Sequence, residues 1–170
     1  MCKYWTVVFL VLMSSLASGQ VQPATKGGVK NGVYALFSGG RPNYGDDWLL
    51  GGTLGGYLQR SHFLGFDGRV TALRWGPSPF HQYVAVAGPR IALGIERWTV
   101  YGTVEGGLGH ASAPAGSRYS GSWLLTAGVD YQINPRVKLR LGEFGYGGIE
   151  VLQHGLNPKT LSAGVVVKLF

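Results

Sequence analysis

Charged residues are scarce in this sequence. Asp, Glu, Lys and Arg make up 14% of the 170 residues, whereas about 25% is usual for soluble domains. A soluble fold needs a charged, water-facing exterior, so this composition disfavours an ordinary secreted enzyme. The net charge of +7 is dispersed along the chain, which argues against a dedicated nucleic-acid binder because such proteins gather their basic residues in a patch.

Cysteine is almost absent, and long apolar runs are missing. The one cysteine, Cys2, precedes the first hydrophobic run, so it cannot be a lipid-attachment residue at a cleavage point. The remaining chain therefore has no disulfide and no cysteine metal ligand. After residue 20 no stretch approaches the roughly 20 apolar residues of a membrane-spanning helix, which excludes a helical membrane protein.

The first 19 residues have the pattern of an export signal. Lys3 precedes an apolar run from Trp5 to Met13, and small residues follow up to a predicted cleavage site near Ala17 or Gly19. The length is that of about one domain. We therefore predict a signal peptide at 1–19, a short periplasmic N-terminal segment at 20–30 and a single folded domain at 31–170.

Glycine is abundant, and so are segments in which apolar and polar residues alternate. The chain has 29 glycines, far above the average usage of about 7%. In residues 122–133, Trp123, Leu125 and Val129 share one strand face, while Thr126 and Asp130 share the other. The same period of two recurs at 33–38, 48–58, 64–73, 83–93, 98–109, 137–146 and 161–170. Eight predicted strands fit a closed antiparallel barrel, which has an even number of strands.

The predicted connections alternate in length. Long ones at 39–47, 76–82, 110–121 and 147–159 alternate with short ones at 59–62, 95–97 and 134–136. This asymmetry is typical of an up-and-down outer-membrane barrel with short periplasmic turns and longer outer loops. All-β architecture with eight antiparallel strands crossing the membrane is therefore the predicted fold.

Charges inside the predicted strands lie on the polar faces. An Arg or Lys facing hydrocarbon at the midplane costs about 2–4 kcal/mol, so we expect these charges to point inward and to pair in a narrow lumen. The predicted lumen network is Asp67, Arg69, Arg90, Glu105, Asp130 and Arg140. It is either a structural plug or a gate in which alternative ion pairs open a narrow pore. Aromatic residues near strand ends predict interfacial girdles: Trp48, Tyr57, Trp75, Tyr83, Trp98, Trp123 and Tyr131.

Residues 30–170 resemble the small eight-stranded outer-membrane β-barrels typified by the transmembrane domain of outer-membrane protein A. The most specific element is the last strand, in which Ser162, Gly164, Val167, Leu169 and the closing Phe170 match the family's C-terminal insertion signal. The resemblance implies that the barrel-assembly machinery reads this strand. Because Lys168 shares the parity of Phe170, we expect Phe170 to lie past the membrane band or to follow a bulge.

The resemblance also implies an outer-membrane location, contact with lipid and a monomeric state. The expected role is structural, with an extracellular ligand possible through the outer loops and with no cofactor. We expect no peptidoglycan-binding domain, because the sequence stops at the last strand. The alternatives are a narrow pore, a lipid-modifying barrel enzyme, or a secreted lipocalin-like carrier with its faces reversed, which the shortage of charge disfavours.

Two groups of residues are candidate chemical sites. His110, Ser112 and Glu105 are the residue types of a nucleophilic triad, but Glu105 is predicted to point into the lumen and Ser112 lies in a predicted loop. Asp46 and Asp47 are potential cation ligands, yet adjacent acids in a polar loop are more often simply solvated. We therefore expect no enzymatic activity and no metal site.

Overall fold

The computed structural model describes residues 30–41, 48–75, 81–113, 116–149 and 157–169. The predicted signal peptide and all but the last residue of the predicted N-terminal segment lie outside the described residues, as do Asp46, Asp47 and Phe170. Within these ranges no helix is long and apolar enough to cross a membrane.

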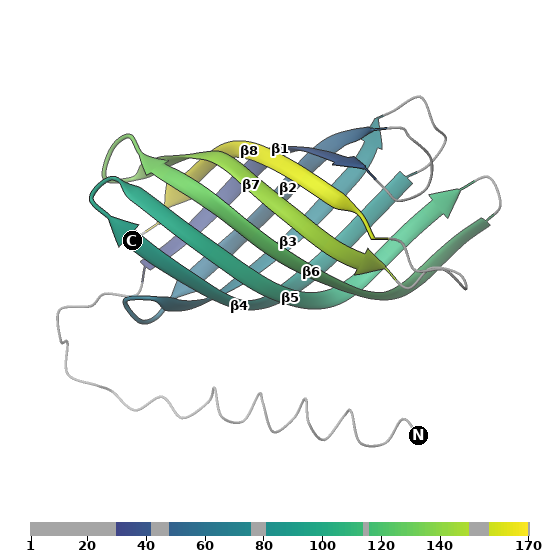
Figure 1. Ribbon diagram of the computed structural model, residues 1–170, viewed down its shortest axis with the longest axis horizontal. Helices are drawn as coiled ribbons and strands as arrows, with labels where there is room; N and C mark the ends of the chain where they lie inside the picture. Colours follow the sequence, from purple (N-terminus) through teal and green to yellow (C-terminus); the bar gives the residue numbers. More distant parts are fainter. Residues whose placement is uncertain (1–29, 42–47, 76–80, 114–115, 150–156, 170) are drawn as a thin grey trace, which may run out of the picture.

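The described strands form one closed antiparallel barrel in chain order (Figure 1). They are β1 (Lys30–Arg41), β2 (Leu49–Gln59), β3 (Leu64–Trp75), β4 (His81–Ile95), β5 (Trp98–Ala113), β6 (Gly116–Gln132), β7 (Val137–Ile149) and β8 (Lys159–Lys168). Each strand pairs with its sequence neighbours, and β1 also pairs with β8, so that closure leaves no free sheet edge. The predicted eight-stranded up-and-down barrel is confirmed.

The two ends of the barrel differ. At the turn end, where β1 begins and β8 ends, the strands are joined by residues 60–63, 96–97 and 133–136. The loop end carries the connections 42–48, 76–80, 114–115 and 150–158. In the two-residue turn between β4 and β5, Glu96 has a positive φ of 53°, a conformation that non-glycine residues seldom adopt.

The prediction of a long connection at 110–121 is wrong. Strand β5 continues to Ala113 and β6 begins at Gly116, with cross-strand pairs from His110 and Tyr119 up to this turn. The resulting strands have 16 and 17 residues, against 10 for β8, and the hairpin reaches past the neighbouring strand ends at the loop end (Figure 1). Its small residues have low strand propensity, but the hairpin ladder holds them extended.

The exterior is apolar and the interior carries the charges. Leu54 and Leu108 are each 66% exposed and Val104 is 59% exposed, whereas Asp67 and Asp130 are fully buried. Apolar outward residues recur on every strand for which the burial pattern is complete. An apolar belt of this kind is far larger than the patches that soluble monomers expose, and it suits hydrocarbon as the surrounding medium.

Candidate functional site in the barrel interior

The interior is arranged in layers along the barrel axis. Nearest the loop end is an apolar cluster formed by Leu49, Leu73, Val84, Val86, Ala111 and Ile149, with Leu124 packed against it. Next comes a chain of hydroxyl groups in which Ser162, Ser38, Thr53 and Thr71 are linked at 2.8 Å from β8 across β1 and β2 to β3. The charged residues follow toward the turn end.

Six charged side chains form a closed ring of alternating sign. Around the ring, Arg69 pairs with Asp67 at 3.5 Å, Asp67 with Arg90 at 2.9 Å, and Arg90 with Asp130 at 3.7 Å. Asp130 then pairs with Arg140 at 2.8 Å, Arg140 with Glu143 at 2.9 Å, and Glu143 with Arg69 at 2.5 Å. Glu105 branches from the ring, with its carboxylate 2.9 Å from Nε of Arg69. We call these seven residues the lumen network.

Three tyrosines pack against the seven residues of the lumen network. Arg90 lies between the rings of Tyr57 and Tyr101, at 4.4 and 4.0 Å from their centroids, and Arg140 lies 4.3 Å from the centroids of Tyr34 and Tyr101. The hydroxyl of Tyr34 donates to Asp67 and that of Tyr101 donates to Glu143. Guanidinium groups stacked on aromatic rings gain cation–π attraction where water is excluded, so the tyrosines help to offset the burial of the arginines.

The structure brings together all six residues of the predicted charge network. It adds Glu143, which sequence reasoning missed because simple alternation from Arg140 assigns Glu143 to the lipid face. The pairing of β7 with β6 and β8 shifts by one residue between Arg140 and Glu143. This β-bulge at Leu141 and Gly142 reverses the parity, so both charges point inward. A Glu on a lipid-facing parity was the available sign of the bulge.

Each lumen tyrosine lies directly opposite a glycine on the adjacent strand. Tyr34 pairs with Gly55, Tyr57 with Gly32, and Tyr101 with Gly128. A Cβ at these glycines would lie 2.5, 2.7 and 2.6 Å from Cζ of the facing tyrosine. The glycines thus leave room for each ring to lie flat across the neighbouring strand, where it covers exposed backbone and contacts the arginines.

We expect Gly128→Ala to destabilise the barrel by about 1–3 kcal/mol, the usual cost of forcing extra volume into a packed interior. The new methyl group displaces the Tyr101 ring from Glu143 and from both arginines. Gly106→Ala on the outward face of β5 is the matched control, because a Cβ there meets nothing within 4 Å. Denaturant unfolding in micelles measures the difference, and equal midpoints for the two variants would contradict the proposed packing.

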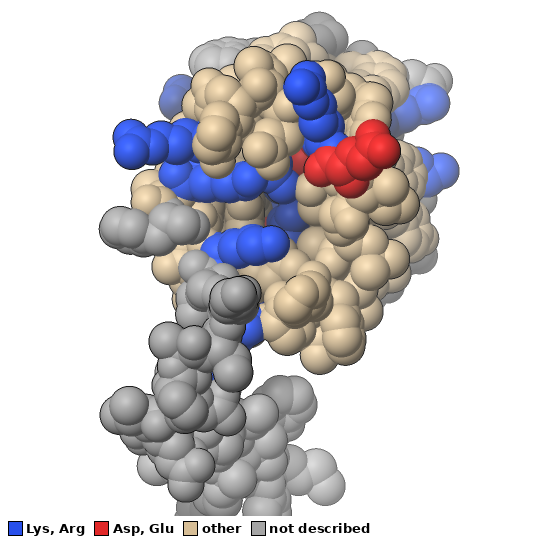
Figure 2. Space-filling model, turned by 90° about the vertical axis from the view of Figure 1, so that its left-hand side faces the viewer, with Lys and Arg blue, Asp and Glu red and all other residues tan. Residues whose placement is uncertain are grey.

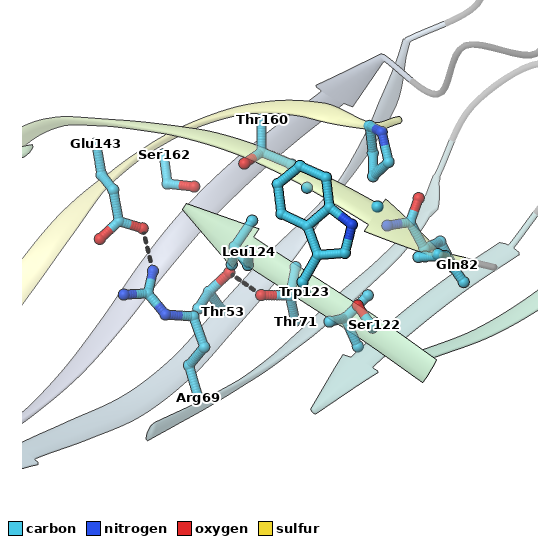
Figure 3. A pocket seen from close by; sticks show the side chains of 15 residues that line it. Thr53, Arg69, Thr71, Gln82, Ser122, Trp123, Leu124, Glu143, Thr160 and Ser162 are labelled. Atoms are coloured by element: carbon cyan, nitrogen blue, oxygen red, sulfur yellow. Dashed lines mark hydrogen bonds and ion pairs between the residues drawn. The ribbon is translucent and has the colours of Figure 1, made fainter. Parts of the chain in front are cut away.

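A cavity of about 20 Å³ lies beside the hydroxyl chain (Figure 3). Its volume is enough for about one water molecule. Arg69 and Glu143 lie at one end of the lining, Gln82 lies at the other, and Trp123 lies between them. The volume is far below the roughly 300–1,000 Å³ of typical small-molecule pockets, so this cavity is a packing defect and not a substrate site.

Most of the predicted girdle residues face outward. Trp48, Tyr83, Trp98 and Trp123 are 39–53% exposed, and Tyr131 is half-buried. Trp98 packs on Tyr131 at 4.8 Å near the turn end, and Trp123 packs on Tyr146 at 5.6 Å nearer the loop end. The side chain of Trp75 lies outside what the structure describes.

The assignment of Tyr57 to a girdle is wrong. Its side chain is 5% exposed and stacks on Arg90 inside the lumen. Leu54 and Leu58 occupy the outward face of β2, and Tyr57 has the opposite parity to both. The prediction rested on an aromatic ring near a strand end. The alternation along β2 assigns Tyr57 to the inward face.

The predicted insertion signal is split between the two faces of β8. Ser162 is buried and hydrogen-bonded to Ser38, whereas Val167 and Leu169 are 39% and 49% exposed. Gly164 lies where β1 and β8 approach closely, since a Cβ there would be 2.7 Å from the Cα of Leu36. These positions agree with the spacing of the motif, and its reading by an assembly machinery stays a prediction.

The triad residues do not converge. Glu105 points into the lumen and binds Arg69, while His110 packs on Tyr119 at 4.3 Å and on Tyr83 at 6.1 Å on the opposite face of the wall. The structure therefore does not join His110 to Glu105 as a base and its partner. Among the residues that the structure describes, no group of three or more His, Cys, Asp or Glu side chains is arranged to hold a metal ion.

Comparison with known proteins gives structural relatives only. No family model and no curated protein matches the sequence. Among solved structures, Neisserial surface protein A aligns with a TM-score of 0.65 and 19% identity over 84% of this chain and 98% of that one. OprG, an outer membrane protein of Pseudomonas aeruginosa, gives 0.58 and 10% over 83% and 96%. Ail, the attachment invasion locus protein of Yersinia pestis, solved with the heparin analogue sucrose octasulfate, gives 0.55 and 19% over 83% and 97%. These alignments establish a common fold, and at identities this low they establish the fold alone.

Proposed function

We propose that this chain, which has the fold of the small eight-stranded outer-membrane β-barrels, is an integral protein of a bacterial outer membrane. The observation that carries the proposal is the inversion of polarity, with the leucines and valines outside and the lumen network inside. The short turns then face the periplasm and the β5–β6 hairpin faces outward. The barrel-assembly machinery is the proposed partner that reads Ser162, Gly164, Val167, Leu169 and Phe170.

The lumen network is proposed to act as a plug. Its ion pairs satisfy charges that are 0–4% exposed, and the apolar cluster adds a second closed layer toward the loop end. A buried network of this kind favours one strand register, because a slip of one residue turns every inward charge toward lipid. The protein is thus proposed to be a structural, non-enzymatic monomer whose outward interactions are made by the loop end.

Surface interaction is proposed for the projecting β5–β6 hairpin. Tyr119 on this hairpin is 77% exposed, and loop ends held by a rigid scaffold often carry binding functions. Ail was solved with a sulfated sugar, which supports testing sulfated and anionic glycans first. Loss of glycan binding in a variant with the hairpin shortened by residues 111–118, with the barrel still folded, would assign the interaction to this element.

Heat-modifiable gel migration of the refolded protein, together with circular dichroism, tests the proposed location. We expect a β-rich spectrum and an unboiled band that migrates faster than the boiled one, in detergent and in liposomes. A β-rich protein that stays dispersed without detergent would contradict a membrane barrel and would favour a ligand carrier.

Planar bilayer recordings test the plug. We expect no stable conductance steps from the wild-type barrel, because the alternating charge ring and the apolar cluster both cross the lumen. Reproducible, voltage-dependent steps would contradict the plug and assign the ion pairs to a gate. Protein that is shown by gel migration to be inserted provides the control against failed reconstitution.

A further inference from the structure

The turn-end mouth of the barrel is ringed by basic side chains. Figure 2, which looks at this end, shows Lys and Arg side chains around a central hollow and few acidic ones. Arg60, Arg97 and Arg136 lie exposed in the three turns, with Glu96 as the exposed acid among these turns. Lys30, Lys138 and Lys168 lie on the inward faces of β1, β7 and β8. Because β7, β8 and β1 are consecutive around the barrel, the three lysines occupy one side of the mouth.

These lysines are not paired with acids. In the part of the chain that the structure describes, no carboxylate oxygen lies within 4 Å of the ammonium group of any of the three. The Lys138 ammonium donates to the Thr99 hydroxyl at 2.7 Å, and that of Lys168 donates to the Gln132 amide oxygen at 2.8 Å. Asp130 is the carboxylate that attracts the Lys138 charge, but it already forms ion pairs with Arg140 and Arg90.

Lys138 is the informative member of the group. It is 8% exposed, and a buried ammonium is normally paired with an anion because desolvation is otherwise costly. The Asp130 carboxylate attracts its charge, whereas the charges of Lys168, Arg90 and Lys30 repel it. In the lumen network, deeper in the barrel, every arginine pairs with at least two carboxylates. The lysines at the mouth have no such partners among the described residues.

We infer that this mouth, comprising Lys30, Lys138 and Lys168 with Thr99 and Gln132, is a binding site for a phosphate-bearing anion. Ammonium groups are common phosphate ligands, and a basic cleft with low-dielectric walls concentrates anions. The Thr99 hydroxyl and the Gln132 amide add uncharged hydrogen-bonding groups at the same level. The phosphate belongs either to an anionic lipid headgroup of the adjacent leaflet or to a soluble phosphoester.

Titration with inorganic pyrophosphate at constant ionic strength tests the site. The full-length barrel is held in maltoside micelles, which contain no phosphate, so the result does not depend on where the protein resides in the cell. We expect saturable binding by calorimetry, with amide shifts at Thr99, Gln132 and Lys138. Lys138→Met is expected to weaken binding at least tenfold. Lys159→Met, which removes an exposed lysine at the loop end, is expected to leave binding unchanged.

Stability provides a second readout that a purely structural lysine would not give. Without pyrophosphate, Lys138→Met is expected to unfold at the same or a higher denaturant concentration than wild type, because an unpaired buried charge is removed. Pyrophosphate is expected to raise the midpoint of wild type and not that of the variant. Absence of saturable binding, or equal affinity in wild type and Lys138→Met, overturns the inference.

Nanodiscs of two lipid compositions distinguish a lipid headgroup from a soluble phosphoester as the source of the phosphate. If phosphatidylglycerol discs lower the affinity for pyrophosphate relative to phosphatidylcholine discs, and if Lys138→Met removes this difference, the site is assigned to a lipid headgroup. If the affinity is the same in both discs, the site is assigned to a soluble phosphoester. Both results support an anion site at the turn-end mouth.

Discussion

Arg69→Met is expected to destabilise the barrel by about 3–5 kcal/mol, which is the cost of removing one partner from a buried ion pair. Arg69 contacts Glu143, Glu105 and Asp67 at 2.5, 2.9 and 3.5 Å. Its removal leaves Glu105 without an ion-pair partner among the described residues and opens the charge ring. The free energy of unfolding, measured by tryptophan fluorescence in liposomes with increasing denaturant, gives the effect.

Arg74→Met is the matched control for this variant. Arg74 belongs to the same strand as Arg69 but is exposed, and surface substitutions usually change stability by less than about 0.5 kcal/mol. Similar unfolding midpoints for Arg69→Met and Arg74→Met would mean that the lumen network contributes nothing to stability. A large loss in both variants would point instead to a general effect of charge on β3.

Val104→Arg is expected to cost about 2–4 kcal/mol, the penalty for a lipid-facing Arg at the bilayer midplane. Val104 is 59% exposed on β5 and lies opposite Leu125, in the middle of the apolar belt. The next residue along the strand, Glu105, carries a charge without this penalty because it faces the lumen. Folding yield in liposomes, together with the unfolding midpoint, measures the loss.

Ile133→Arg tests whether depth in the membrane sets that cost. Ile133 is 52% exposed just after β6, at the turn end, so it is also apolar and outward-facing but lies near the interface. An Arg there is expected to cost about 0–1 kcal/mol. Equal losses at Val104 and Ile133 would contradict the assignment of an apolar belt that ends at the turns.

The alternation of side chains was sufficient to predict most of the barrel. A charge on a strand of this kind has only two directions, and the cost of facing lipid is large, so Asp67, Arg90 and Asp130 were correctly placed on the inward face. The same argument identified the outward residues of β8. It needs no knowledge of which strand residues are paired, and therefore works from sequence alone.

Features that depend on strand register were not predictable in this way. The bulge at Leu141 and Gly142 changes which face Glu143 occupies. Strict alternation has no place for an inserted residue, and Glu143 on a lipid-facing parity is the one sign of it in this strand. The tyrosine–glycine pairs were also missed, because Tyr101 and Gly128 are far apart in sequence and become opposite only when β5 and β6 are aligned. Register is set by the whole barrel and not by either strand.

The closing strands of the barrel differ from the rest in a way that bears on its assembly. The charge ring takes its members from β3, β4, β6 and β7, so neither β1 nor β8 supplies one. Where β1 and β8 meet, the inward contacts are the hydrogen bond between the hydroxyls of Ser38 and Ser162 and the apolar packing of Val166 with Tyr34 and Leu36. The last strand can therefore join the first without burying a member of the charge ring at the joint. The charge ring needs only β3, β4, β6 and β7, so pairing of β8 with β1 adds no ion pair to it.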